Sequence, residues 1–168
     1  VKPQSNKELS LIPLELSTFL VEWLSLKTEV NLKVKWPNDI FTNNFQKCGG
    51  ILCHYINPQT IVAGIGLNYG SISFGKSHSY NTTPGSISDM IQLSEDDKKS
   101  LPLDFYNFFL ERSSSKENKL TIWENLCIHM NEKVKISLSD DNFKTGIFRG
   151  IGKNGEAILE LDNSKIEK

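Results

Sequence analysis

The stretch that decides the fold is Lys35-Trp36-Pro37-Asn38-Asp39, and three short blocks follow it closely in the chain. These blocks are Lys47, Gly49-Gly50-Ile51-Leu52 and Gly64-Ile65-Gly66-Leu67-Asn68. They combine the apolar pattern of β-strands with glycines or polar residues that an ordinary strand disfavours. A cluster of this kind predicts a ligand site built on neighbouring strands.

The first block predicts a strand that ends at a proline. Over residues 32–36 apolar side chains alternate with lysines, which is the period of a half-buried strand, and Lys35 falls on its polar side. Pro37 removes a donor from the ladder and turns the chain. We therefore expect Asn38 and Asp39 at the end of the strand, where ligand-contacting polar groups are common. Taken alone, an ordinary strand end followed by an Asx turn explains the same residues.

Lys47 and the two glycines after it combine charge with bare backbone. A lysine ammonium can place one positive charge between two anionic groups. Gly49 and Gly50 weaken the apolar strand that they begin, so either a ligand approaches the backbone there or the strand carries a β-bulge. The block by itself leaves these two interpretations open.

The second glycine pair lies on a neighbouring strand. Residues 51–56 and 60–67 are apolar runs joined by a short polar turn, which predicts an antiparallel hairpin. Gly64 and Gly66 share one face of their strand, and Asn68 at its end offers a donor and an acceptor that suit a purine edge. The hairpin would set the two glycine pairs opposite each other, which predicts a flat slot floored by peptide groups.

Helices flank this hairpin, and a small β module ends the chain. We expect an amphipathic helix at residues 12–26 and a surface loop at residues 70–86. Further helices are predicted at residues 87–93, 103–112 and 120–130, with Pro102 in the first turn of the middle one. Three short strands follow at residues 134–138, 146–151 and 157–161, without a closing strand. The predicted class is α+β, a mixed or antiparallel sheet packed with helices, in a domain of residues 1–130 followed by an incomplete module of residues 131–168.

Composition indicates an ordinary globular protein. The chain has 168 residues, of which 38% are apolar and 23% charged, and its net charge is −1. This balance gives no reason to expect a nucleic acid or a membrane as partner, and no apolar run approaches the ~18 residues that span a bilayer. The three cysteines lack metal-ligand spacing, so we expect reduced thiols, a cytoplasmic protein and no metal site. The start, Val1-Lys2-Pro3-Gln4, suggests a chain cut from a longer one.

Together the central blocks resemble the catalytic core of the biotin protein ligases. The pair Trp36-Pro37 distinguishes them from the related lipoate ligases, which usually place a smaller residue there. The resemblance continues through Ile122-Trp123-Glu124 and through Gly146-Ile147-Phe148-Arg149-Gly150-Ile151, which is similar to the SH3-like C-terminal domain of that family. It covers nearly the whole chain, and it implies a class II synthetase-like biotin/lipoate ligase fold followed by a small SH3-like β-barrel.

The resemblance also implies a reaction in two steps. Biotin and Mg-ATP would give biotinyl-5′-AMP and pyrophosphate, and a lysine of a biotin carboxyl carrier domain would then displace AMP. Lys47 would contact the biotin carboxylate and the α-phosphate, and Asp39 would position the adenylate or its metal. In this scheme the residues from Gly49 to Leu52 face biotin, Asn68 binds adenine, and Arg149 reaches in from the small domain. The binding residues implied in this way are Lys35, Trp36, Asn38, Gly49, Gly50, Ile51, Leu52, Gly64, Gly66, Asn68 and Arg149.

The sequence departs from the family in what it lacks. The family has a Gly-Arg-Gly-Arg loop and an upstream Ser/Thr-Gln set, whereas this chain has only two arginines, Arg112 and Arg149, neither in such a loop. We therefore expect the C-terminal part of a ligase, slow to form biotinyl-AMP by itself and compatible with a homodimer. Two alternatives stay open, a non-catalytic binding or regulatory module and a lipoate- or octanoate-transferring relative.

Overall fold

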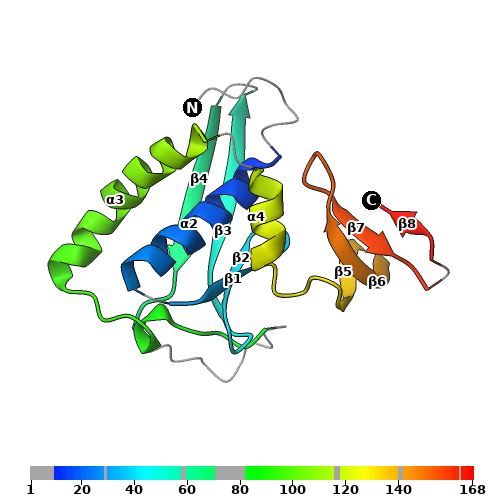
Figure 1. Ribbon diagram of the computed structural model, residues 1–168, viewed down its shortest axis with the longest axis horizontal. Coiled ribbons are helices and arrows are strands. Elements are labelled where there is room, and N and C mark those ends of the chain that lie inside the picture. The colour runs from blue at the N-terminus through cyan, green and yellow to red at the C-terminus, as the bar shows by residue number, and fades with distance from the viewer. Residues whose placement is uncertain are drawn as a thin grey trace.

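The computed structural model describes residues 10–28, 30–57, 60–70, 82–115, 118–139, 142–162 and 164–168. It contains two antiparallel four-stranded sheets, with strand orders β1-β2-β3-β4 and β5-β6-β7-β8 (Figure 1). The first sheet comprises β1 (Leu32–Lys35), β2 (Asp39–Thr42), β3 (Lys47–Asn57) and β4 (Thr60–Leu67). The second comprises β5 (Lys133–Ser139), β6 (Asn142–Ile151), β7 (Ala157–Glu160) and β8 (Ile166–Glu167). The helices are α2 (Ile12–Thr28), α3 (Glu95–Ser113), α4 (Lys119–Leu126) and the short 3₁₀ helix η1 (Ile87–Asp89). The predicted α+β class is confirmed.

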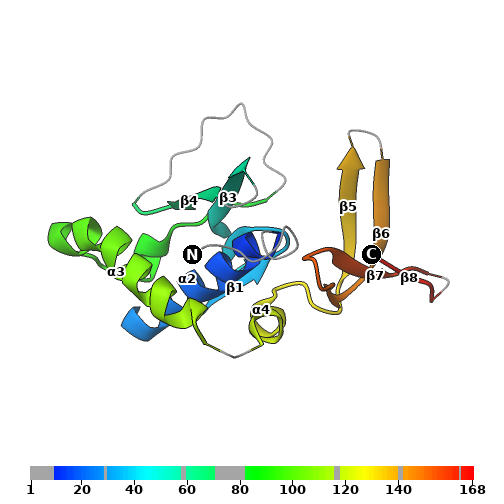
Figure 2. The ribbon, with the colours of Figure 1, turned by 90° about the horizontal axis from the view of Figure 1, so that it is seen from above.

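The helices α2 and α3 cover one face of the first sheet, and no helix of the described residues lies on its other face (Figures 1 and 2). Val34, Ile40 and Ile51 point from the strands into this covered side and are fully buried. The helices pack on each other through aromatic side chains, because the Trp23 and Phe105 rings lie 5.6 Å apart at a tilt. Burial of this layer is the main source of the domain's stability.

Three of the helices have boundaries that differ from the sequence prediction. α3 begins at Glu95 rather than near residue 103, because Ser94 and Asp97 form a capping box that satisfies the first backbone N–H groups. Pro102 therefore lies inside the helix and not in its first turn. α4 ends at Leu126, because Cys127 leaves the helix and bridges to Val34 beside β1. Only Ile87–Asp89 of the predicted helix at residues 87–93 is helical.

The structure also has more strands than the sequence predicts. β2 was missed, although it lies between β1 and β3 and starts at Asp39 directly after the turn that follows Trp36. β8 was missed as well, and it pairs with β7 where no closing strand was expected. Most of the predicted loop at residues 70–86 lies outside the described residues.

The second sheet packs against α4. Phe148 is fully buried and its ring lies 4.3 Å from that of His129 and 6.3 Å from that of Trp123. The Ile151 N–H donates to Glu124 Oε1 at 3.1 Å. In the described part of the chain β5 and β8 do not pair, so this sheet is open, and a closed SH3-like barrel stays a prediction. The boundary between residues 130 and 131 also stays a prediction.

None of the helices described is long and apolar enough to cross a membrane.

Candidate functional site

One row of paired residues crosses all four strands of the first sheet on its open face. Lys35 pairs with Asp39, Asp39 with Gly50, and Gly50 with Gly66. Because directly paired residues of antiparallel strands point to the same face, these residues form one line. We call Lys35, Asp39, Gly50 and Gly66 the site row.

Lys47 lies beside the site row on the same face. Its Nζ is 2.5 Å from Asp39 Oδ1, and both side chains are partly exposed. A Cβ atom placed on Gly50 would lie 3.3 Å from Asp39 Oδ1 and 3.8 Å from Lys47 Cε. The sequence prediction that an ammonium group flanks bare backbone agrees with this geometry.

Three of the four motif glycines open the slot, and the fourth does not. Gly64 pairs with Leu52 and shares the face of Gly66, and a Cβ atom on either glycine would meet nothing closer than 3.9 Å. Gly49 points the other way, where a Cβ atom would lie 2.7 Å from the Gly66 carbonyl oxygen. The expected slot of four glycines is therefore corrected to three.

The same alternation divides the strand that was expected to face biotin. Ile51 is fully buried beneath the helices, whereas Leu52 is 76% exposed on the open face. Successive residues of a strand point to opposite faces, so only Gly50 and Leu52 of the motif can meet a ligand on this side. Gly49 and Ile51 belong to the covered side.

Asn38 and Asn68 hold the site together through the backbone. Asn38 donates from its side chain to the Ile51 carbonyl, and its own carbonyl accepts the Ile51 N–H at 2.9 Å. Asn68 donates from its side-chain nitrogen to the carbonyls of Lys47 at 3.3 Å and Gly85 at 3.0 Å. The amide hydrogens of Asn68 are thus engaged within the protein, and a contact with adenine through this side chain, still a prediction, is limited to its oxygen.

Two predicted binding residues lie apart from the slot. Trp36 donates its indole N–H to the Gly155 carbonyl at 3.0 Å, which directs its ring nitrogen toward the β module. Arg149 is held within that module, where its Nε lies 2.7 Å from Glu160 Oε2 and its Nη1 2.7 Å from Asn131 Oδ1. These contacts indicate structural roles for both side chains in this state.

Some residues around the site were not found from sequence. The segment after the long loop pairs with Lys47, whose N–H donates to the Thr83 carbonyl and whose carbonyl accepts the Gly85 N–H, both at 2.8 Å. His129 lies near Lys35, and burial together with the lysine charge lowers the pKa of His129 to about 4. No local signal marks these residues, because their partners are distant in the chain.

Burial raises the pKa of all three cysteine thiols. Cys48, Cys53 and Cys127 are free thiols. Burial raises the pKa of Cys48 to about 12 and that of Cys127 to about 11, so both stay protonated at neutral pH. Among the described residues no group of three or more His, Cys, Asp or Glu could hold a metal ion.

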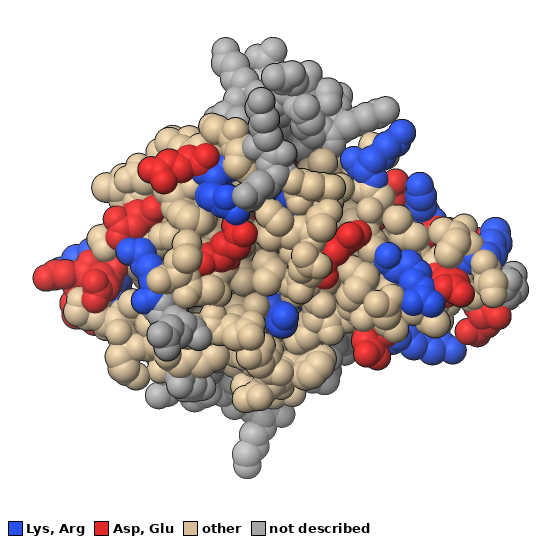
Figure 3. Space-filling model, in the orientation of Figure 1, with Lys and Arg blue, Asp and Glu red and all other residues tan. Residues whose placement is uncertain are grey.

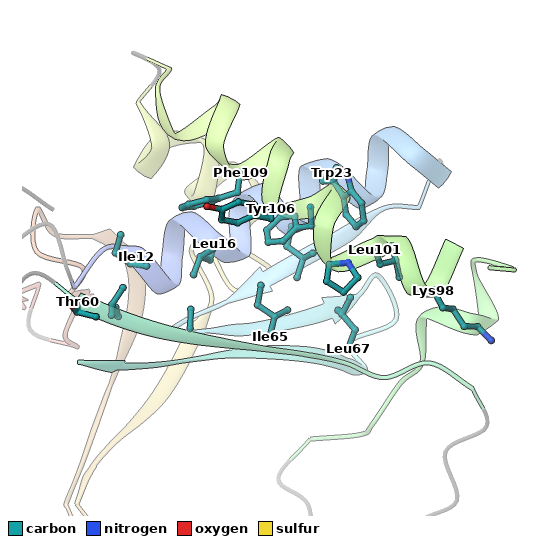
Figure 4. A pocket seen from close by; sticks show the side chains of 15 residues that line it. Ile12, Leu16, Trp23, Thr60, Ile65, Leu67, Lys98, Leu101, Tyr106 and Phe109 are labelled. Atoms are coloured by element: carbon teal, nitrogen blue, oxygen red, sulfur yellow. The ribbon is translucent and has the colours of Figure 1, made fainter. Parts of the chain in front are cut away.

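A separate apolar cavity lies on the covered side of the sheet. Its volume is about 730 Å³, and it opens between α2, α3 and the edge strand β4. Figure 4 shows Leu16, Tyr106 and Phe109 above Ile65 and Leu67 of β4. It lies across the sheet from the site row, so we do not assign the predicted chemistry to it.

Figure 3 shows basic and acidic side chains interspersed over the face on view, in keeping with the net charge of −1.

Comparison with known proteins gives a match in structure only. No protein-family model matches the chain, and no curated protein does. A biotin protein ligase from Aquifex aeolicus superposes with a TM-score of 0.78 and 23% identity, over 99% of this chain and 74% of that one. A structure of the Aquifex aeolicus ligase with biotin and ATP gives 0.73 and 22% identity, over 98% of this chain and 69% of that one. The Leishmania major ligase with biotinyl-5-AMP gives 0.60 and 16% identity, over 98% and 74%.

These matches cover both sheets and the helices between them. The chain therefore has the fold of the biotin protein ligases, as the resemblance of its motifs predicted. Identities of this size establish the fold, and the activity has to be argued from the site.

Proposed function

We propose that the open face of the first sheet binds a biotinyl-adenylate and that the chain is the part of a biotin protein ligase that carries this site. The observation on which this rests is the site row with Lys47 beside it. Bare backbone at Gly50, Gly64 and Gly66 lets a flat ligand lie against peptide groups. One ammonium group stands where a carboxylate and a phosphate would meet.

In the proposed first step a biotin carboxylate oxygen attacks the α-phosphorus of ATP. The new P–O bond forms as the bond to the β-phosphate bridging oxygen breaks, and pyrophosphate leaves with that electron pair. Lys47 would stabilise the negative charge that builds between the two reactants. The Lys47 ammonium lies 2.5 Å from Asp39 Oδ1, and this ion pair keeps it over the row. Binding of two anions would draw Lys47 toward them.

In the proposed second step an acceptor amine attacks the acyl carbon of the adenylate. The acceptor is a lysine of a biotin carboxyl carrier domain. As its C–N bond forms, the bond from the acyl carbon to the phosphate oxygen breaks, AMP leaves with that electron pair, and the amine nitrogen releases a proton to water. Asp39 is the residue that would hold a Mg²⁺ ion bound with ATP, and such an ion would neutralise part of the phosphate charge. Three free thiols suit the reducing cytoplasm that we propose as the location.

Calorimetry with biotinol-5′-AMP, a stable analogue of the adenylate, tests the proposal. Lys47→Met should weaken binding tenfold to a hundredfold, the range expected for one lost hydrogen bond to a charged group. Lys33→Met is the matched control, because Lys33 points to the same face and pairs with Phe41. It removes the same charge without touching the row and should change affinity less than threefold. Equal losses in the two variants would show a diffuse charge effect and contradict the assigned role.

A second measurement separates the alternatives. The octanoyl and lipoyl analogues of the same adenylate should bind at least tenfold more weakly than the biotin analogue. The reverse order would favour a lipoate- or octanoate-transferring relative. Binding of the biotin analogue followed by no transfer to a carrier domain, even after a segment with the missing arginine loop is added, would favour a non-catalytic binding module.

A further inference from the structure

The outer side of β1, the edge strand that carries Lys35, is covered by the chain that leads into the β module. Val34 and Cys127 form a parallel bridge, and the Ile128 N–H donates to the Val34 carbonyl at 2.9 Å. An edge strand has unpaired backbone groups, so this contact fixes one side of β1. It lies immediately before Lys35 in the chain.

The β module makes a second contact immediately after Lys35. The Trp36 indole N–H donates to the Gly155 carbonyl at 3.0 Å. The preceding carbonyl, that of Asn154, accepts a hydrogen bond from Ser10 Oγ at 2.6 Å. Gly155 has a φ of +86°, and a Cβ atom there would lie 3.1 Å from the Ser10 carbonyl oxygen. The tip of this turn therefore lies directly against the domain that carries the site.

The turn that makes this contact is braced by its own hydrogen bonds. The Gly155 N–H donates to the Gly152 carbonyl at 2.9 Å, and the Gly152 N–H donates to the Glu156 carbonyl at 2.8 Å. The Asn154 N–H donates to the Glu156 carboxylate at 2.9 Å. A turn closed by these hydrogen bonds can hold the Trp36 side chain in place.

Beyond Trp36 the chain is tied to β3. The Asn38 carbonyl accepts the Ile51 N–H at 2.9 Å, and Asp39 then joins the site row opposite Gly50. The two ends of the segment from Lys35 to Asp39 pair with each other, and its second half is also bonded to β3 through Asn38 and Asp39. The Trp36 indole supplies the contact from the β module to the first half of the turn, and without it that half is held by strand pairing alone.

We propose that Trp36 is a positioning residue through which the β module fixes the segment that bears Lys35 and Asp39. We call the hydrogen bond between Trp36 and Gly155 the latch. The expected consequence is that the β module strengthens adenylate binding without contacting the ligand. This consequence rests on the proposed function. The structural part of the inference, that the latch holds the segment, stands by itself.

Amide hydrogen exchange tests the structural part. The reporter is the Ile51 N–H, and the amides of β4 paired with β3 are the internal reference. Trp36→Phe removes the donor and keeps an aromatic ring, and it should speed exchange of the reporter about three- to tenfold relative to β4, the worth of one hydrogen bond. Trp23→Phe is the matched control, because the Trp23 ring packs on Phe105, between α2 and α3. It should affect both groups of amides alike.

Gly155→Ala perturbs the latch at its acceptor residue, in the β module. Its Cβ atom would meet the Ser10 carbonyl and its φ disfavours alanine, so the reporter should respond as it does to Trp36→Phe. The inference is wrong if either variant leaves the reporter unchanged or changes it together with β4. Affinity for biotinol-5′-AMP should fall about three- to tenfold in both variants. If the unaltered protein does not bind the analogue, the proposed function fails, and the exchange comparison still decides whether the latch acts.

Discussion

The two faces of the first sheet are built from the same strands and differ in almost every other respect. The covered face presents Val34, Ile40 and Ile51, all fully buried against the helices. The open face presents the site row, with charged side chains at one end and glycines at the other. Alternation along each strand produces both surfaces from one stretch of sequence.

Neighbouring residues of one strand therefore serve different purposes, because one contributes to packing and the next faces the proposed ligand site. On the covered face a substitution changes packing, which proteins tolerate poorly. On the open face Gly50, Gly64 and Gly66 carry no side chains, and this leaves room for a ligand. The substitutions below test the separation in order of decreasing expected effect on stability.

The largest effect is expected from truncating the covered face. Ile51→Ala should lower the free energy of unfolding by about 2–5 kcal/mol, because a fully buried side chain leaves a cavity. Leu52→Ala, one residue on, should cost less than about 0.5 kcal/mol, because Leu52 is exposed. Urea denaturation of both variants gives the comparison. Similar losses would show that the open face is also a packing surface.

The next effect concerns pH at the edge where the sheet meets the β module. The pKa of His129 is lowered from 6.5 to about 4 by burial and by Lys35, so the folded state keeps this imidazole neutral while the unfolded chain protonates it. The contribution of His129 to stability is therefore fully present above pH 6.5 and is lost as the pH drops toward 4, by at most about 3 kcal/mol because the ring is only partly buried. His129→Leu should remove this part of the fall in urea titrations at several pH values. The same replacement at His54, an exposed position, is the control, and an unchanged slope in His129→Leu would contradict the assignment.

The glycines offer a matched pair with a smaller effect. Gly49→Ala places a Cβ atom 2.7 Å from the Gly66 carbonyl oxygen and should cost about 1–3 kcal/mol in unfolding free energy. Gly66→Ala meets nothing closer than 3.9 Å and should be neutral or slightly stabilising. Gly66→Ala should nevertheless weaken binding of biotinol-5′-AMP, because it raises the floor of the slot. Thermal unfolding and calorimetry on the two proteins separate these outcomes, and a stable Gly49→Ala protein would refute the assignment of Gly49 to the covered side.

Much of the site could be predicted from sequence because it depends on local patterns. The alternation before Pro37 and the spacing of Gly64 and Gly66 were enough to place Lys35 and both glycines on polar or open faces. The same rule, applied to adjacent residues, separates Gly49 from Gly50, and the structure shows them on opposite faces. That correction needed no tertiary information.

Other features depend on partners far along the chain and could not be predicted. Asn68 is held by Gly85, and the indole of Trp36 by Gly155, and neither contact leaves a trace in the local sequence. The start of α3 is a different case, because Ser94 and Asp97 mark it locally, whereas the sequence prediction places Pro102 in its first turn. β2 was missed because its four residues lie between two turn signals.

The most direct test is a map of where a biotinyl-adenylate analogue binds. Titration of the ¹⁵N-labelled protein with biotinol-5′-AMP should shift the amide signals of Gly50, Gly64 and Gly66, and Lys47→Met should weaken the response at all three. Shifts confined to Leu16, Phe105 and Phe109 would place the ligand in the cavity beneath the helices, and they would contradict the assignment of the open face.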